Sequence, residues 1–187
     1  MQQVRTAFWL AVLAAIVAVT DAVLTALGRA RFTADVDELG WAINENAPYD
    51  GTRQRFVFCL VVALVVAVAA LAAAALVTRP RPASRLGILV ALPLSVLLDL
   101  FTVVYAPDGV GTGGRGAKPE DLAETEAAFD RLFPLWYTGG HTTAVVALGA
   151  LTVAMVLKLR KPAVMEYFEF EDAESLRAGL FSGRTGA

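Results

Sequence analysis

The chain has 187 residues, of which 57% are hydrophobic and 18% charged, and its formal net charge is −2. Ordinary soluble proteins carry about 25% charged residues, and this apolar, nearly neutral balance excludes intrinsic disorder and a strongly basic nucleic-acid-binding protein. The single cysteine, Cys59, excludes an intrachain disulfide and argues against a cysteine zinc site. The single histidine, His141, excludes an HExxH zinc site and a bis-histidine haem within the chain. We therefore expect no metal, no cofactor and no nucleic-acid partner.

The apolar residues are concentrated in four blocks, and each block approaches or exceeds the ~20 residues needed to cross a bilayer. They cover residues 7–28, 56–78, 86–106 and 141–159. Stretches this long and this apolar favour membrane helices, because a helix at the surface of a soluble protein needs a polar face. The first block is longer than the ~7–15-residue apolar core of a signal peptide, which favours a retained helix. We predict an all-α membrane protein in which residues 1–161 form a bundle of four transmembrane helices.

The connections between the blocks differ in length. Residues 79–85 (RPRPASR) form a short link with two prolines, so we expect the second and third blocks to form an antiparallel hairpin. The other two links are long and acidic, and each contains a segment with apolar residues three or four apart, at 32–43 and 120–135. We expect these segments to be short amphipathic helices that lie across one end of the bundle. Pro119, followed by acids, predicts the start of the second one.

Positive charges next to the blocks predict the orientation in the membrane. Three arginines lie in the 79–85 link, three basic residues lie at the C-terminal exit of the fourth block, at 158–161, and Arg5 precedes the first block. The two long links hold as many basic residues, but these are spread among eleven acids. This density favours a multi-pass protein of the cell membrane with both termini in the cytoplasm and both long links outside. Amphipathic aromatic residues are then expected near the outer interface: Trp41, Trp136 and Tyr137.

Two regions are candidate surfaces for a protein partner. Residues 162–187 form a polar C-terminal tail that we expect to leave the membrane, with a possible short helix at 174–181. The tail either docks on the bundle or on another protein, or stays unstructured, and the sequence favours neither outcome. A stripe of small residues on the second block fits close helix approach, within the bundle or between two protomers: Ala63, Ala67, Ala70 and Ala74.

Two acidic residues interrupt the apolar blocks, although such a residue costs ~2.5–3.5 kcal/mol at the centre of a membrane helix. Asp21 lies seven residues before Gly28, and Asp99 lies six residues before Tyr105. At 1.5 Å per residue, both carboxyls are expected roughly 10 Å below the same end of the bundle. Further polar residues share their helix faces at a spacing of three or four. The candidate site therefore has six members: Asp21, Thr25, Ser95, Asp99, Thr102 and His141.

Three interpretations of this site stay open. In the first, the two aspartates hydrogen-bond to neighbouring helices and fix their packing. In the second, they form an ion or proton site of a small transporter or channel. In the third, they are the proton-sharing carboxylate pair of an intramembrane hydrolase. We favour the first, in a non-enzymatic accessory or scaffold subunit that acts through helix packing and its tail. For His141, a place at the membrane interface is favoured over a role beside Asp99.

Overall fold

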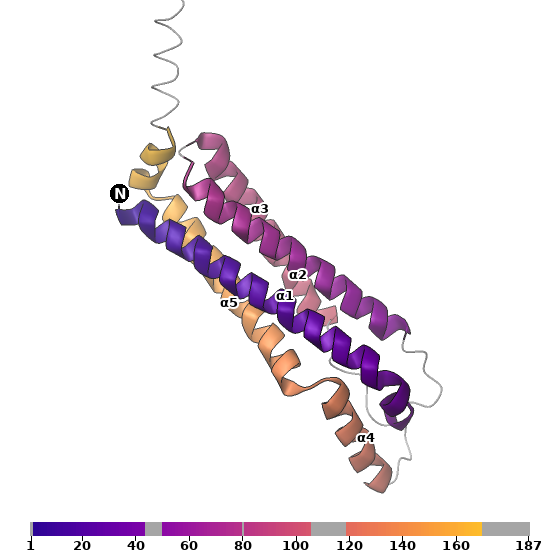
Figure 1. Cartoon of the computed structure of the whole chain (residues 1–187). Helices are drawn as coiled ribbons and strands as arrows, with labels where there is room; N and C mark the ends of the chain where they lie inside the picture. Colours follow the sequence, from indigo (N-terminus) through magenta and orange to yellow (C-terminus); the bar gives the residue numbers. More distant parts are fainter. Residues whose placement is uncertain (1, 44–49, 80, 106–118, 170–187) are drawn as a thin grey trace, which may run out of the picture.

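The computed structural model describes residues 2–43, 50–79, 81–105 and 119–169, and these residues are all-helical apart from turns. The long helices are α1 (Gln2–Ile43), α2 (Asp50–Val77), α3 (Pro82–Tyr105), α4 (Pro119–Leu132) and α5 (Leu135–Leu159) (Figure 1). A short helix over residues 162–169 follows α5. Of these, α1, α2, α3 and α5 are long and apolar enough to cross a membrane. The prediction of an all-helical chain with four such helices is confirmed.

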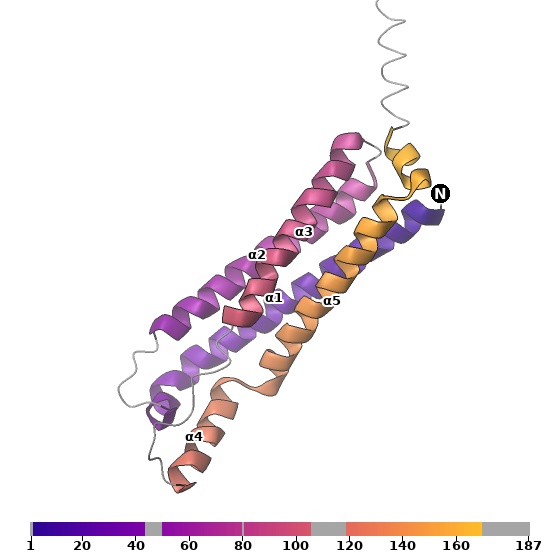
Figure 2. The same cartoon turned by 180° about the vertical axis from the view of Figure 1, so that it is seen from behind.

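These four helices form an antiparallel bundle (Figures 1 and 2). Both α1 and α3 pack on α2 and on α5, so α1 and α3 face each other across a diagonal. Small side chains of α1 and α2 dominate the core, because they let the helix backbones approach closely. Three members of the predicted small-residue stripe, Ala63, Ala67 and Ala70, are buried there. This face of α2 is therefore occupied within the chain.

The length of α1 differs from the prediction. The helix runs for 42 residues, so the 32–43 segment continues the first apolar block and is not a separate helix across the bundle end. Gly28, expected at the end of that block, lies within the helix. A Cβ atom at Gly28 would stand 2.7 Å from Cδ2 of Tyr137, so the glycine lets this ring pack against the α1 backbone. Beyond it, Phe32 and Val36 are buried one turn apart, which holds the extension in place.

A second hydrophobic cluster surrounds the extension of α1, and we call it the distal cluster. Phe56 of α2 and Phe133, which follows α4, stack with ring centroids 6.3 Å apart and planes 4° apart. Phe32 of α1 contacts both rings. Helices α1, α2, α4 and α5 therefore meet at this end of the bundle around one apolar centre. The buried members of the distal cluster are Phe32, Val36, Phe56, Leu132, Phe133 and Tyr137.

Helices α4 and α5 meet near the distal cluster, and both differ in part from the sequence predictions. α4 runs from Pro119 to Leu132, and it packs alongside α1 and does not lie across the bundle. α5 begins at Leu135, six residues before the predicted 141, because the first turn buries Tyr137 in the distal cluster. Tyr137 is therefore a core residue, and its predicted interface position is wrong. Trp136 is exposed, and the side chain of Trp41 lies outside the described residues.

The opposite end of the bundle holds the N-terminal end of α1, the α2–α3 hairpin and the helix at 162–169 (Figure 2). Nε of Arg85 donates to the carbonyl oxygen of Leu159 at 3.1 Å, which satisfies a backbone acceptor at the end of α5. Val164 and Phe168 are fully buried in the main core. The first part of the C-terminal tail therefore docks on the bundle. The predicted helix at 174–181 lies outside the described residues.

Candidate functional site

The candidate site is a chain of polar side chains that crosses the core from α1 to α3. His141 of α5 lies at its centre. Its Nδ1 is 2.8 Å from Oδ1 of Asp21 on α1, and its Nε2 is 3.0 Å from Oγ1 of Thr102 on α3. The Thr102 hydroxyl donates to the backbone carbonyl of Asp99, at 2.5 Å. We call Asp21, His141, Thr102 and Asp99 the polar network, and none of the four is more than 1% exposed.

The helices bring the network together because its members lie on inward faces at matched depth. On α3, Asp99 and Thr102 are three residues apart and share one face, as the spacing predicted. His141 lies almost two turns inside α5, so its ring reaches the core and not the membrane interface that was expected. Since α1 and α3 face each other across the diagonal, the His141 ring joins two helices that do not pack on each other.

The hydrogen bonds fix the tautomer of His141. The Thr102 hydroxyl uses its proton on the Asp99 carbonyl, so its oxygen accepts from the ring and Nε2 carries a hydrogen. A second proton lies between Nδ1 and Oδ1 of Asp21. The pair is then either imidazolium with carboxylate or two neutral groups, and both forms have zero net charge. Zero net charge avoids the large cost of an uncompensated ion in the core.

Asp99 lies beside this pair without bonding to it through its side chain. Its carboxyl is within electrostatic reach of Asp21 and His141. Neither carboxyl oxygen of Asp99 has a hydrogen-bond partner among the described residues, and the same holds for Oδ2 of Asp21 and the hydroxyl of Thr25. The site therefore has a bonded part, centred on His141, and a part in which four buried oxygens remain without a partner.

Other side chains around the network are partly those expected from the sequence. Ser95 is buried, but it donates to the carbonyl of Leu92 on its own helix at 2.8 Å and does not join the network. The ring of Tyr137 stacks on that of His141, with centroids 6.1 Å and planes 15° apart. This contact was missed because α5 was expected to begin at His141. Cys59 of α2 is buried within electrostatic reach of both aspartates.

The chemistry available at the site is hydrogen bonding and proton exchange. Among the residues that the structure describes, no cluster of three or more His, Cys, Asp or Glu side chains is arranged to hold a metal ion. No protein-family model, curated protein or solved structure matches the chain. Its function is therefore inferred from the geometry of the network alone.

The polar network is separated from the surface hollows that the structure describes. Three hollows of 420 to 580 Å³ lie on the described surface, between α1 and α2, between α2 and α3, and between α3 and α5. None of the three is lined by Asp21, Asp99 or His141. The third is lined by Pro93, which lies inside the continuous α3, and by Thr152. In this conformation none of these hollows leads a substrate to the two carboxyls.

Proposed function

We propose that the chain is a small integral membrane protein whose polar network holds α1, α3 and α5 together, in a non-enzymatic accessory or scaffold role. The observation that carries this proposal is the double engagement of His141, which bonds to Asp21 on one side and Thr102 on the other. Within a bilayer, interhelical hydrogen bonds are an important source of specific helix packing, since lipid provides no hydrophobic drive between helices. The density of basic residues supports a cytoplasmic location for both termini.

The same geometry argues against the hydrolase alternative. A catalytic carboxylate pair shares a proton between its two members and must meet its substrate. Here Oδ1 of Asp21 is engaged by the His141 ring and not by Asp99. Both carboxyls are buried, with Asp21 1% and Asp99 0% exposed. The arrangement is better suited to fixing helix positions than to attacking a bond.

Two substitutions of Asp21 test the packing proposal. An asparagine can donate an amide hydrogen to Nδ1 of neutral His141, so Asp21→Asn is expected to keep the free energy of unfolding within about 1 kcal/mol of the wild type. A leucine of similar size leaves Nδ1 of His141 without a hydrogen-bond partner, so Asp21→Leu is expected to lower the free energy of unfolding by about 1–3 kcal/mol. The matched control is Thr152→Val, because the buried Thr152 hydroxyl has no partner among the described residues. Equal stability of Asp21→Leu and Thr152→Val in detergent would end the proposal.

The accessory role needs a separate measurement, because a stable bundle alone does not reveal a partner. The tagged full chain is cross-linked in its native membrane and purified beside a truncation that stops at residue 169. We expect a specific partner with the full chain, and its loss from the truncation assigns the contact to the tail. Recovery of the chain without any specific partner contradicts the accessory role. Extraction of the wild-type chain by alkaline carbonate contradicts membrane insertion itself.

A second candidate function, proton transfer, is favoured by the unbonded carboxyl of Asp99. A buried carboxyl without a partner costs least as a neutral acid, and buried Asp and His residues form the proton relays of membrane pumps. For this function, proteoliposomes that hold the wild-type chain must dissipate a pH gradient faster than empty liposomes. Asp99→Asn is expected to abolish that flux, and Ser95→Ala, one turn away, is expected to preserve it. Wild-type flux no faster than that of empty liposomes contradicts this candidate.

A further inference from the structure

Two arginines without an ion-pair partner among the described residues lie at the end of the bundle that holds the distal cluster. Five arginines of the described residues lie there, and three are within ion-pair distance of acids at 2.9 to 3.9 Å: Arg31 and Arg131 near Asp35, and Arg53 with Asp37. Arg29 and Arg55 form no ion pair within the part of the chain that the structure describes. Both are exposed. This end also carries exposed acids, Glu38, Glu126 and Asp130, so the attraction for an anionic ligand is local to these two guanidinium groups.

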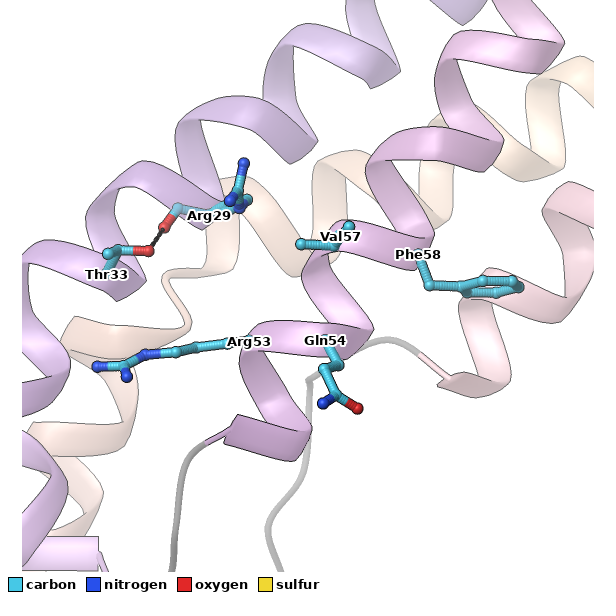
Figure 3. Close-up of a pocket in the computed structure, with 6 residues that line it drawn as sticks. All are labelled: Arg29, Thr33, Arg53, Gln54, Val57 and Phe58. Carbon is cyan, nitrogen blue, oxygen red and sulfur yellow. Dashed lines mark hydrogen bonds between the residues drawn. The ribbon is translucent and has the colours of Figure 1, made fainter.

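Each of the two unpaired arginines lines a hollow, and the hollows adjoin. The first, of 420 Å³, lies between α1 and α2 and is drawn in Figure 3. The second, of 580 Å³, lies between α2 and α3. Gln54 and Phe58 line both hollows, and Figure 3 shows Phe58 directed away from α1. We call the two together the α2 groove, because they flank the same turns of α2.

The α2 groove is polar toward the end of the bundle and mainly apolar one turn deeper. In the first hollow, Thr33, Arg53 and Gln54 form the polar part, and Arg29 lies one turn deeper than Thr33 on α1, beside Val57 (Figure 3). Arg55 lines the second hollow, on the other side of α2. Val57 and Phe58 lie four residues after Arg53 and Gln54, so they occupy the next turn toward the middle of the bundle. In the second hollow, Leu98 and Phe101 add an apolar wall. These four apolar side chains are all exposed, at 41 to 58%.

The two levels match the layers of a bilayer. Arg29 follows directly on the apolar block that ends at Gly28, and Arg55 directly precedes the block that begins at Phe56. If the blocks cross the membrane, as proposed above, both residues border the apolar layer, from which a long arginine side chain can reach the lipid phosphates. Guanidinium binds phosphate through short, charge-assisted and often bidentate hydrogen bonds. The apolar residues one turn deeper face the region of the acyl chains.

We propose that the α2 groove binds an anionic phospholipid, whose head group is attracted by Arg29 and Arg55 and whose acyl chain lies along Phe58, Leu98 and Phe101. The charge selects the anion, and the exposed apolar wall selects a lipid over a free phosphate. The proposal rests on membrane insertion of the four helices, but it does not depend on the role of the polar network.

The test is a titration of the full-length chain, purified in a neutral detergent, with fluorescently labelled phosphatidylglycerol. An exposed ion pair contributes at most about fivefold to affinity, so the double variant Arg29→Gln/Arg55→Gln is expected to bind up to about 25-fold more weakly. The matched control, Arg79→Gln/Arg81→Gln, removes two exposed arginines at the opposite end of the bundle. It is expected to change the affinity less than twofold.

Competition separates the possible sources of the anion. Unlabelled phosphatidylglycerol is expected to displace the probe, whereas phosphatidylcholine and soluble glycerol phosphate are expected to do so only at far higher concentration. Equal competition by glycerol phosphate assigns a soluble anion and overturns the lipid proposal. Equal loss in both double variants overturns it as well. Carbonate extraction of the Arg29→Gln/Arg55→Gln variant keeps the two hypotheses apart, because a variant that stays in the membrane shows that insertion holds whatever its lipid preference.

Discussion

Replacing His141 by leucine removes the centre of the polar network while keeping a side chain of similar size. The change deletes the hydrogen bonds to Asp21 and Thr102. Interhelical hydrogen bonds of membrane proteins contribute ~0.6 kcal/mol on average and at most ~1.7 kcal/mol each. The carboxyl of Asp21, left without its partner in the core, adds a cost of about 1–3 kcal/mol. We therefore expect His141→Leu to lower the free energy of unfolding by about 2–5 kcal/mol.

The assay is equilibrium unfolding in mixed micelles, in which a denaturing detergent is titrated into the purified chain and tryptophan fluorescence is followed. Thr152→Val on the same helix is the control and is expected to change stability by less than about 1 kcal/mol. The double variant Asp21→Leu/His141→Leu leaves no stranded carboxyl, so its loss should be smaller than the two single losses combined. Additive losses, or a His141→Leu chain as stable as the control, would refute the hydrogen-bonded network.

Three further predictions concern the fold. Gly28→Ala pushes a Cβ atom into Tyr137 and is expected to cost about 1–3 kcal/mol in the same assay, whereas Gly149→Ala, with open space around it, is expected to cost nothing. Phe133→Ala opens the distal cluster and is expected to cost about 3–5 kcal/mol, with faster proteolysis within α4 in intact vesicles of known orientation. In cells that express a Cys59→Ala background, Glu126→Cys should react with a membrane-impermeant thiol reagent and Ala83→Cys only after lysis; the reverse pattern contradicts the proposed orientation.

The four apolar helices could be predicted from the sequence because a span is a property of composition over about 20 residues. The helix faces that meet in the core could also be predicted, since helical spacing alone places Asp99 and Thr102 on one side of α3. Matched depth along α1 and α3 followed from the rise per residue. What brings the site residues together was therefore visible in local periodicity.

The sequence predictions that were wrong concern features that depend on contacts between distant segments. Gly28 resembles a helix end in the sequence, and only the approach of Tyr137 shows that the glycine makes room for a ring. The polar 29–38 stretch remains helical because Phe32 meets Phe56 and Phe133, which are far away in the chain. His141 was misplaced for the same reason, since the distal cluster draws the start of α5 back to Leu135. No local sequence pattern indicates these contacts between distant segments.

The uninterrupted course of α1 has a mechanical consequence. Its 42 residues measure about 63 Å at 1.5 Å per residue, roughly twice the thickness of the hydrocarbon layer. Because the helix does not break at Gly28, no hinge separates Asp21 in the core from Phe32 and Val36 in the distal part. A torque applied to the distal part turns Asp21 through nearly the same angle and stretches its hydrogen bond to His141. The helix thus transmits twist from its distal part to the middle of the bundle.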